Sequence, residues 1–430
     1  MENYSKLTVE KNYSLNCSMF VLLVSILPLA DLLNGYFIFN AINIPLGVIY
    51  RLGFITFLIV SILLKNIDES VFTVITVFFL IVNSTLIVVQ SIILLNPSEW
   101  IIEDFSILSK YFLWILITYY LYQRRYYFQK IKFENIFIII SLFFTLGLLI
   151  PYLIGQGTNT YTSGVGFKGY FFAQNDITLS FIISLVFTAK VLLKHLEKKW
   201  NLYVMFLSIL YIGNIISLVL IGTKTALLCG VVVSLYLIYR VFFKTSYQTV
   251  IHRIFIWLSI AVMALWFFYR GLGYTITALD GVLKRFEYFY GKYDGNIIRI
   301  ITSQRLEFLK GGTEKFLSDP NSNLVLLFGQ GFEYRMKTFG RLGLIEMDFF
   351  DVLFSLGIIG FVANLILIVF FLTICLKNRL NTVYEKLFIV ILFYSFFAGH
   401  TFFSAMCSTL LGLVCGGIII FHNKDISIKK

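Results

Sequence analysis

Long apolar runs alternate with short polar connections along most of this chain. FTVITVFFLIVNSTLIVVQSIILL (Phe72 to Leu95) and YVMFLSILYIGNIISLVLIG (Tyr203 to Gly222) are typical of these runs. A helix rises 1.5 Å per residue, so about 20 apolar residues cross a ~30 Å hydrocarbon core. The pattern therefore predicts an all-α polytopic membrane protein with about twelve transmembrane helices, centred near residues 26, 55, 83, 113, 145, 184, 212, 233, 262, 363, 392 and 412.

One long hydrophilic stretch, residues 271–348, interrupts this alternation between the ninth and tenth predicted helices. Structureless loops above about 15 residues are uncommon in folded proteins. The aromatic-rich RFEYFYGKYDG and the helix-like SQRLEFLKGGTEKFL favour an ordered segment here. We expect a single integral-membrane domain, residues 1–430, that contains this large loop.

Composition excludes a soluble fold, because 59% of the 430 residues are hydrophobic and only 13% are charged. A net charge of +12 would suggest nucleic acid as the partner of a soluble protein, but in a membrane protein the positive-inside rule accounts for it. With the N-terminus in the cytoplasm, most lysines and arginines fall in inside loops, whereas NPSEWIIED (Asn96 to Asp104) falls outside. The sequence therefore predicts a multi-pass protein with both termini cytoplasmic, an extracytoplasmic loop 271–348 and no nucleic-acid partner. Abundant Ile, Phe, Lys and Asn suggest an AT-rich bacterial genome, so we expect the membrane to be a bacterial cell membrane.

Four polar clusters fall on the predicted outer face. They are GYFFAQND (Gly169 to Asp176), IGTKTALL (Ile221 to Leu228), SQRLEFLKGG with the following LLFGQGFEYRMKTFGRLG, and EMDFFDVLFSLGIIG (Glu346 to Gly360). A charge inside hydrocarbon costs about 2.5 to 3.5 kcal/mol on insertion scales, so charges beside apolar runs are either interfacial or functional.

The cations of these clusters have two interpretations each. Lys224 either extends toward lipid headgroups or holds an anion at a helix start, where Thr223 could act as N-cap. The guanidinium groups of Arg305, Arg335 and Arg341 suit phosphate, although single surface arginines are often only solvated.

The acids also have a structural interpretation. Asp348 could be the N-cap of the helix FFDVLFSL, with Asp351 in the capping-box position, but this leaves Glu346 unexplained. Of the four histidines, only His400 lies near the outer face, and packing is the favoured interpretation there. Metalloprotease, Walker A and serine hydrolase motifs do not occur.

Taken in order, these motifs resemble the O-antigen polymerase (Wzy-type) and O-antigen ligase superfamily. The similarity covers roughly Gly169 to Phe361. It rests on FFAQND, with Asn175 in the family's asparagine-rich turn, and on GTKTALL, RLEFLKGGTEKFL…LLFGQGF and MDFFDVLFSLGIIGF. Two departures matter: Lys224 replaces the usual arginine, and Asp348 stands where ligases commonly carry histidine, which favours a polymerase.

The resemblance implies a metal-independent glycosyltransferase without a cofactor. Its donor would be an oligosaccharide linked through pyrophosphate to undecaprenol, and its acceptor a sugar hydroxyl of another repeat unit. Flippase and chain-length regulator proteins are the further partners it suggests, besides the bilayer. The resemblance implies catalytic roles for Asp348 and Arg305 and substrate-binding roles for Lys224, Arg335, Arg341 and Asn175, and no metal ligands.

Two other functions remain open at this point. A ligase that transfers finished glycan to another acceptor uses the same chemistry. A lipid-linked oligosaccharide flippase or another transporter also has about twelve helices. Transport is less favoured, because charges within the apolar runs are scarce and a large late loop is not expected of a transporter.

Overall fold

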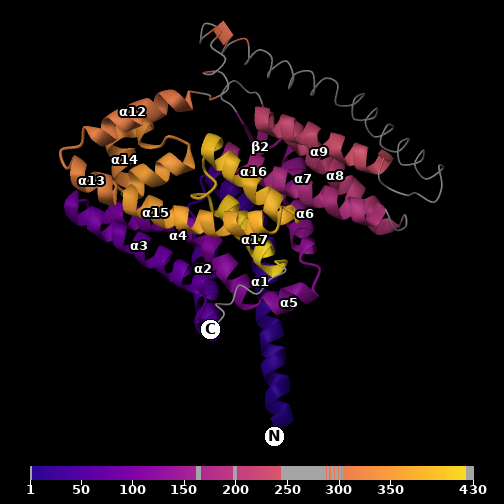
Figure 1. Ribbon diagram of the computed structural model, residues 1–430. Helices are drawn as coiled ribbons and strands as arrows, with labels where there is room; N and C mark the ends of the chain where they lie inside the picture. The colour runs from indigo at the N-terminus through magenta and orange to yellow at the C-terminus, as the bar shows by residue number, and fades with distance from the viewer. Residues whose placement is uncertain are drawn as a thin grey trace. The chain divides into compact units, whose positions relative to one another are not determined.

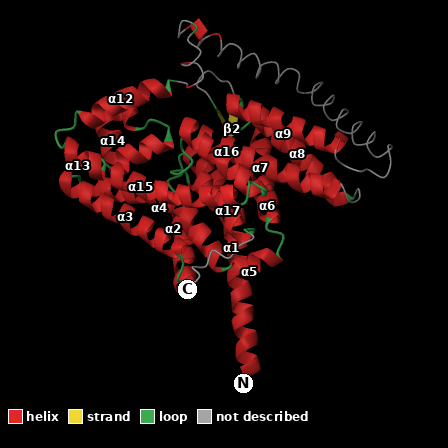
Figure 2. Cartoon of the chain, in the orientation of Figure 1, coloured by secondary structure: helices red, strands yellow, loops and turns green. Residues whose placement is uncertain are grey.

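Helices make up nearly all of the chain that the structure, a computed structural model, describes (Figures 1 and 2). It describes residues 2–160, 166–196, 201–243 and 304–422, together with Glu287, Tyr290, Gly291, Gly295, Arg299 and Thr302. Two short strands, β1 (Thr158–Asn159) and β2 (Phe167–Gly169), pair antiparallel between two helices. The prediction of an all-α class is confirmed for the described residues.

Eight of the described helices are long and apolar enough to cross a membrane. In lipid every backbone polar group needs an internal partner, and a helix supplies it within its own segment. These candidate spans are Tyr13–Phe39 of α1 (Glu2–Phe39), α2 (Leu46–Leu63), α3 (Val71–Ile93), α6 (Glu134–Leu153), α7 (Gln174–Leu196), α8 (Leu202–Ile221), Lys224–Val241 of α9 (Lys224–Phe243) and α15 (Asp348–Lys377).

Three further predicted centres coincide with helices outside this set of eight. They are α4 (Ser98–Gln123), α16 (Val383–Ala398) and α17 (Ala405–Ile420). The predicted run near residue 262 lies outside the described residues. The count of twelve therefore stays a prediction.

The chain divides into two compact units. The first comprises Met1–Leu23, Gly47–Phe133 and Ile298–Lys430, and the second comprises Val24–Leu46 and Glu134–Ile297. In the first unit, α4 packs closely along α17. A side chain added at Gly412 of α17 would lie 2.8 Å from the carbonyl oxygen of Trp114, and the Thr118 hydroxyl donates to the Gly412 carbonyl at 3.1 Å. Glycine thus lets these two backbones approach.

The described part of the predicted loop consists of short helices in the first unit. They are α12 (Arg305–Leu317), α13 (Ser322–Phe328), α14 (Phe332–Phe339) and the 3-10 turn η1 (Gly340–Gly343). The helices α12, α13 and α14 lie together near α15 in Figure 1. The expected helix in RLEFLKGGTEKFL is confirmed as α12. Phe316, Val325, Ile345, Met347 and Phe354 form the apolar core that joins these helices to α15.

The second unit is built around α7. Its apolar window is 83% buried, the largest share among the eight candidate spans, and α6, α8 and α9 all pack against it. Leu192 of α7 and Val204 and Leu207 of α8 belong to one buried apolar cluster.

In the first unit, α5 (Arg125–Lys130) follows α4 directly.

Candidate functional site

The start of α15 is held by a break in this helix at Gly357. Its backbone has φ 66° and ψ −174°, which is not helical, so the carbonyls before the break lose their intrahelical donors. The Phe354 and Ser355 carbonyls instead accept from the backbone N–H groups of Gln330 and Gly331, both at 3.0 Å. The first part of α15, which carries two carboxylates, is thereby tied to the FGQG segment at residues 328–331.

Close backbone contact explains the glycines of this crossing. A Cβ at Gly329 would lie 2.5 Å from the Gly357 nitrogen, and a Cβ at Gly357 would lie 2.5 Å from the Gly329 nitrogen. The Gln90 side chain of α3 also donates to the Ser355 carbonyl, at 2.8 Å, and to the Phe328 carbonyl. This amide is fully buried in a candidate span, where an unsatisfied carbonyl would be costly.

Asp104 of α4 fixes the next element, α14. Its Oδ1 accepts from the backbone N–H groups of Phe332 at 2.9 Å and Glu333 at 2.8 Å. A carboxylate at a helix N-terminus satisfies donors that the helix leaves open and interacts favourably with the helix dipole. The predicted loop from Asn96 to Asp104 thus lies mostly within α4, and Asp104 has a structural role that we did not predict from the sequence.

Arg335 of α14 lies inside this assembly. Its side chain is fully buried, its Nη1 donates to Gln330 Oε1 at 2.9 Å and its Nε donates to the Gly343 carbonyl at 3.1 Å. Burial lowers the pKa of Arg335 to about 10, although Asp351 opposes this shift, so the guanidinium stays charged at neutral pH. These contacts hold the side chain in place, but its buried Nη2 has no hydrogen-bond partner among the described residues, and the contact with substrate phosphate stays a prediction.

The Asp351 side chain accepts hydrogen bonds from backbone N–H groups, as the capping-box interpretation expects. Its Oδ1 accepts from the Ile345 N–H at 2.8 Å and its Oδ2 from the Met347 N–H at 3.2 Å. Met347 is the N-cap residue of α15, and Asp348 is already the first helical residue. The interpretation of Asp348 as the N-cap is therefore wrong, because the helix starts one residue earlier than that interpretation requires.

Asp348 binds a different part of the chain. Its Oδ2 accepts from the Thr401 N–H at 2.8 Å, which ties the start of α15 to the segment between α16 and α17. The carboxylate is fully buried, and its Oδ1 has no hydrogen-bond partner among the described residues. The hydroxyl of Tyr111 on α4, which interacts electrostatically with Asp348, is also buried without such a partner. A buried carboxylate oxygen and a buried hydroxyl thus remain open for another polar group.

Glu346 lies between two arginines just before the N-terminal end of α15. Its Oε1 is 2.9 Å from Arg341 Nη2 and its Oε2 is 3.4 Å from Arg305 Nη2. Burial alone would raise the pKa of Glu346, but Arg341, His400 and Arg305 outweigh it and the net shift is downward. The carboxylate is therefore ionised at neutral pH, and this trio carries one surplus positive charge.

The backbone around Glu346 is unusual. Glu346 has φ +63° and His400 has φ +67°, although neither is glycine. A Cβ at Gly399 would lie 2.4 Å from the Glu346 carbonyl carbon, so the two segments touch through their backbones. Left-handed conformations of ordinary residues cost about 1 to 3 kcal/mol and gather at functional sites.

Arg305 and Arg341 differ in access to solvent. The Arg305 side chain is 16% exposed and also donates to the Phe397 carbonyl at 3.0 Å, whereas the Arg341 side chain is 59% exposed and lies over the Phe308 ring. A small cavity of about 130 Å³ beside Arg305 is lined by Met347, Phe350, Phe396 and Phe397, among others. The two guanidinium groups and this cavity form the accessible part of the site.

Lys224 and Asn175 belong to the second unit, whereas Asp348 and Arg305 belong to the first. Thr223 accepts from the Ala226 N–H at 3.1 Å, which confirms its predicted capping role at the start of α9. Its hydroxyl also lies 3.2 Å from that of Thr178, which places the first turns of α7 and α9 side by side. Lys224 and Asn175 lie in these two first turns, and Lys224 is exposed.

Sequence reasoning missed Gln90, Asp104, Tyr111 and Thr401. Gln90 carried a usable signal, because a carboxamide within a long apolar run requires a partner. Thr401 and Tyr111 carried none, since only the tertiary structure brings them to Asp348. Within the described residues no group of three His, Cys, Asp or Glu side chains is arranged to hold a metal ion.

In comparisons with known proteins, no family model and no curated protein matches this chain.

Proposed function

We propose that this chain is a polymerase that joins lipid-linked oligosaccharide repeat units into a surface polysaccharide. The observation that carries the proposal is the Arg305–Glu346–Arg341 trio at the N-terminal end of the apolar helix α15. It supplies surplus positive charge beside a hydrophobic body, which suits a substrate made of pyrophosphate and a polyprenyl chain. The order of motifs that resembles the O-antigen polymerase and ligase superfamily supports the same assignment.

The proposal includes a location and an orientation. The chain lies in a bacterial cell membrane with about twelve helices and with both termini in the cytoplasm. The start of α15 then faces the extracytoplasmic side, where no nucleotide donor is available. Cleavage of the bond between the sugar and undecaprenyl pyrophosphate is therefore the source of the driving force.

Arg305 and Arg341 have the role of binding the leaving group. The acceptor hydroxyl forms a new bond to the anomeric carbon, while the bond from this carbon to the pyrophosphate oxygen breaks and its electron pair leaves with undecaprenyl pyrophosphate. Guanidinium groups that are already placed near this oxygen stabilise the developing charge. Arg341 is exposed enough to move from Glu346 to a phosphate, and Arg305 is held in place by the Phe397 carbonyl.

Asp348 has the role of accepting the proton of the attacking hydroxyl. Its free Oδ1 and the Tyr111 hydroxyl offer a place where a sugar hydroxyl can bind. Because both side chains are fully buried, the acceptor reaches them only after the Gly399 to Phe403 segment moves. Glu346 is a weak base because its pKa is lowered, so its role is to orient the two arginines.

Lys224 and Asn175, in the second unit, have proposed roles as substrate ligands. Lys224 contributes a point charge at the start of α9, where the helix dipole also favours an anion. Asn175, in the first turn of α7, has an amide that suits a sugar hydroxyl.

The test is the length of the surface glycan in a strain that lacks this chain. The proposal expects long polymer to be lost while single repeat units still reach the surface. Loss of all exported repeats would instead indicate a flippase. Long polymer that accumulates on the lipid carrier without transfer would indicate a ligase.

A further inference from the structure

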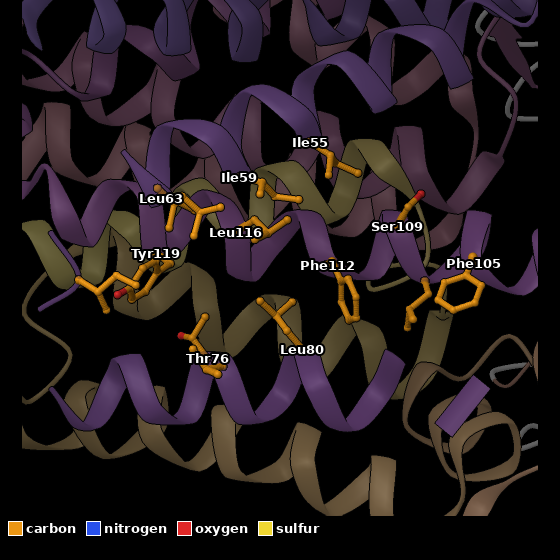
Figure 3. A pocket seen from close by; sticks show the side chains of 14 residues that line it. Ile55, Ile59, Leu63, Thr76, Leu80, Phe105, Ser109, Phe112, Leu116 and Tyr119 are labelled. Carbon is orange, nitrogen blue, oxygen red and sulfur yellow. The ribbon is translucent and has the colours of Figure 1, made fainter. Parts of the chain in front are cut away.

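An apolar groove of about 410 Å³ lies between α2, α3 and α4 in the first unit. Figure 3 shows Phe105 and Ser109 at one end of it and Leu63 with Tyr119 at the other. Apart from the hydroxyls of Thr76, Ser109 and Tyr119, the lining side chains are hydrocarbon. At 1.5 Å per residue, the α4 part from Phe105 to Tyr119 is about 21 Å long, which exceeds half of a ~30 Å hydrocarbon core. A chain from one leaflet fits along it.

The Tyr119 end of the groove adjoins three cations, Lys65, Arg124 and Arg125, which we call the cation cluster. Lys65 follows the lining residue Leu63 and precedes the lining residue Ile67 in the sequence. The Tyr119 hydroxyl lies 3.0 Å from that of Thr73, which donates to the Asp68 carbonyl at 2.7 Å. The Asp68 carboxylate in turn pairs with Arg125 at 3.2 Å. A chain of polar contacts thus links the Tyr119 end of the groove to the cation cluster.

Positive charge is in excess at the cation cluster. Arg124 is 4% exposed, and its guanidinium donates only to neutral oxygens in its hydrogen bonds among the described residues. These are Asn16 Oδ1 at 3.1 Å, Gln123 Oε1 at 3.1 Å and the Ser61 carbonyl at 2.7 Å. Burial lowers the pKa of Lys65. The nearby Arg124 and Arg125 lower it further, whereas Asp68 opposes the shift. An anion bound here would relieve the repulsion.

The surroundings of Lys65 distinguish a lipid from a free anion. Leu64 is 83% exposed and Ile67 is 54% exposed, so hydrocarbon surface flanks the ammonium group directly. Exposed apolar surface of this kind marks contact with lipid or with another protein, and basic residues next to it attract anionic lipids. The groove provides the place for the apolar part of the same ligand.

We propose that the groove and the cation cluster together bind one anionic phospholipid, with an acyl chain along α4 and the phosphate against Lys65 and Arg125. Arg124 positions this pair from inside through its bonds to α1 and α2. This site is separate from the carboxylates of α15 and does not depend on the proposed polymerase activity.

The experiment measures lipids retained by the full-length protein in detergent, using native mass spectrometry with phosphatidylglycerol and phosphatidylcholine. We expect the unaltered protein to retain phosphatidylglycerol in preference to phosphatidylcholine. Lys65→Gln should weaken phosphatidylglycerol binding about fivefold, as expected for one basic group at a membrane surface. Lys65→Arg should bind normally. The control Lys132→Gln removes an exposed cation after α5 and should have no effect.

A second arm tests the groove. Ser109→Trp fills it and should weaken both lipids, whereas the cation variants affect only the anionic one. Equal retention of the two lipids by the unaltered protein would overturn the proposal. So would release of phosphatidylglycerol by millimolar inorganic phosphate, because the cluster would then bind a free ion, or an equal effect of Lys65→Gln and Lys132→Gln.

Discussion

Two places in the first unit, the cation cluster and the start of α15, satisfy their buried charges in different ways. At the cation cluster, Arg124 places all three kinds of guanidinium nitrogen on neutral oxygens and lies over the Tyr120 ring at 4.0 Å. At the start of α15, Asp351 is satisfied by two backbone N–H groups, but Asp348 keeps one oxygen open. Left-handed backbone at Glu346 and His400 occurs only at the second place.

This difference separates buried charges that stabilise the fold from buried charges that can take part in a reaction. A fully bonded buried charge contributes to stability, and removing it leaves its partners unsatisfied. A buried polar atom without a partner lowers stability and is retained where it serves a ligand or a reaction. By this criterion Arg124 and Asp351 stabilise the fold, whereas Asp348 is available for chemistry.

The largest expected effect comes from breaking the support of the α15 carboxylates. Gly357→Ala puts a Cβ at 2.3 Å from the Leu327 carbonyl oxygen in a conformation that only glycine adopts readily. We expect a loss of at least about 3 kcal/mol of stability, seen as little folded protein after detergent extraction. Gly53→Ala in α2 is the control, because a Cβ there meets nothing within 4 Å, and it should extract normally. Normal yield of Gly357→Ala would show that the helix break does not hold the site.

A second prediction compares the cations of the two places. Arg341→Ala should lower polymerisation about 10² to 10³-fold while the protein stays folded, since one preorganised donor to the leaving group is lost. Arg124→Gln should leave turnover per folded molecule unchanged. It should lower the free energy of unfolding by about 2 to 4 kcal/mol, because buried acceptors lose their donor. Turnover per folded molecule and thermal stability in membranes separate the two outcomes. Lys337→Ala, an exposed cation of α14, is the control for both. Full polymer from Arg341→Ala would remove this arginine from the site.

The smallest effect concerns Asp104, whose Oδ1 is bonded at the start of α14 and whose Oδ2 has no hydrogen-bond partner among the described residues. Its oxygen accepts two backbone N–H bonds at the start of α14, and an asparagine oxygen can accept them too. Asp104→Ala should therefore cost about 1 to 2 kcal/mol, and Asp104→Asn a few tenths, with turnover little changed in both. Thermal unfolding in detergent measures the difference. If Asp104→Asn stayed stable but lost turnover, Asp104 would belong with Asp348 rather than with Asp351.

Sequence reasoning went furthest where a local pattern decides the structure. Apolar runs predicted the helices, RLEFLKGGTEKFL predicted α12, and the T-K-T-A order predicted the Thr223 cap. It failed where distant segments meet. The start of α15 was placed one residue late, because the Asp348 carboxylate bonds to Thr401 instead of to its own helix.

Arg335 illustrates the same limit. In sequence it resembles Arg341, which lies six residues later on a polar segment, and both suit phosphate. Only the packing of α14 against Phe354 and Gln330 shows that one is buried and the other exposed. Lys224 and Asn175 belong to a different compact unit from the α15 carboxylates, and no sequence pattern indicates that division.

The most direct measurement of the central claim is polymerisation of lipid-linked repeat units by purified membranes that contain Asp348→Asn. Asparagine keeps an oxygen for the Thr401 N–H bond but cannot take up a proton from an acceptor hydroxyl. The account predicts a protein of normal abundance and stability whose turnover falls about 10² to 10⁴-fold, as for the loss of a general base. Turnover close to that of the unaltered protein would contradict it and leave Asp348 as a tie between the start of α15 and Thr401.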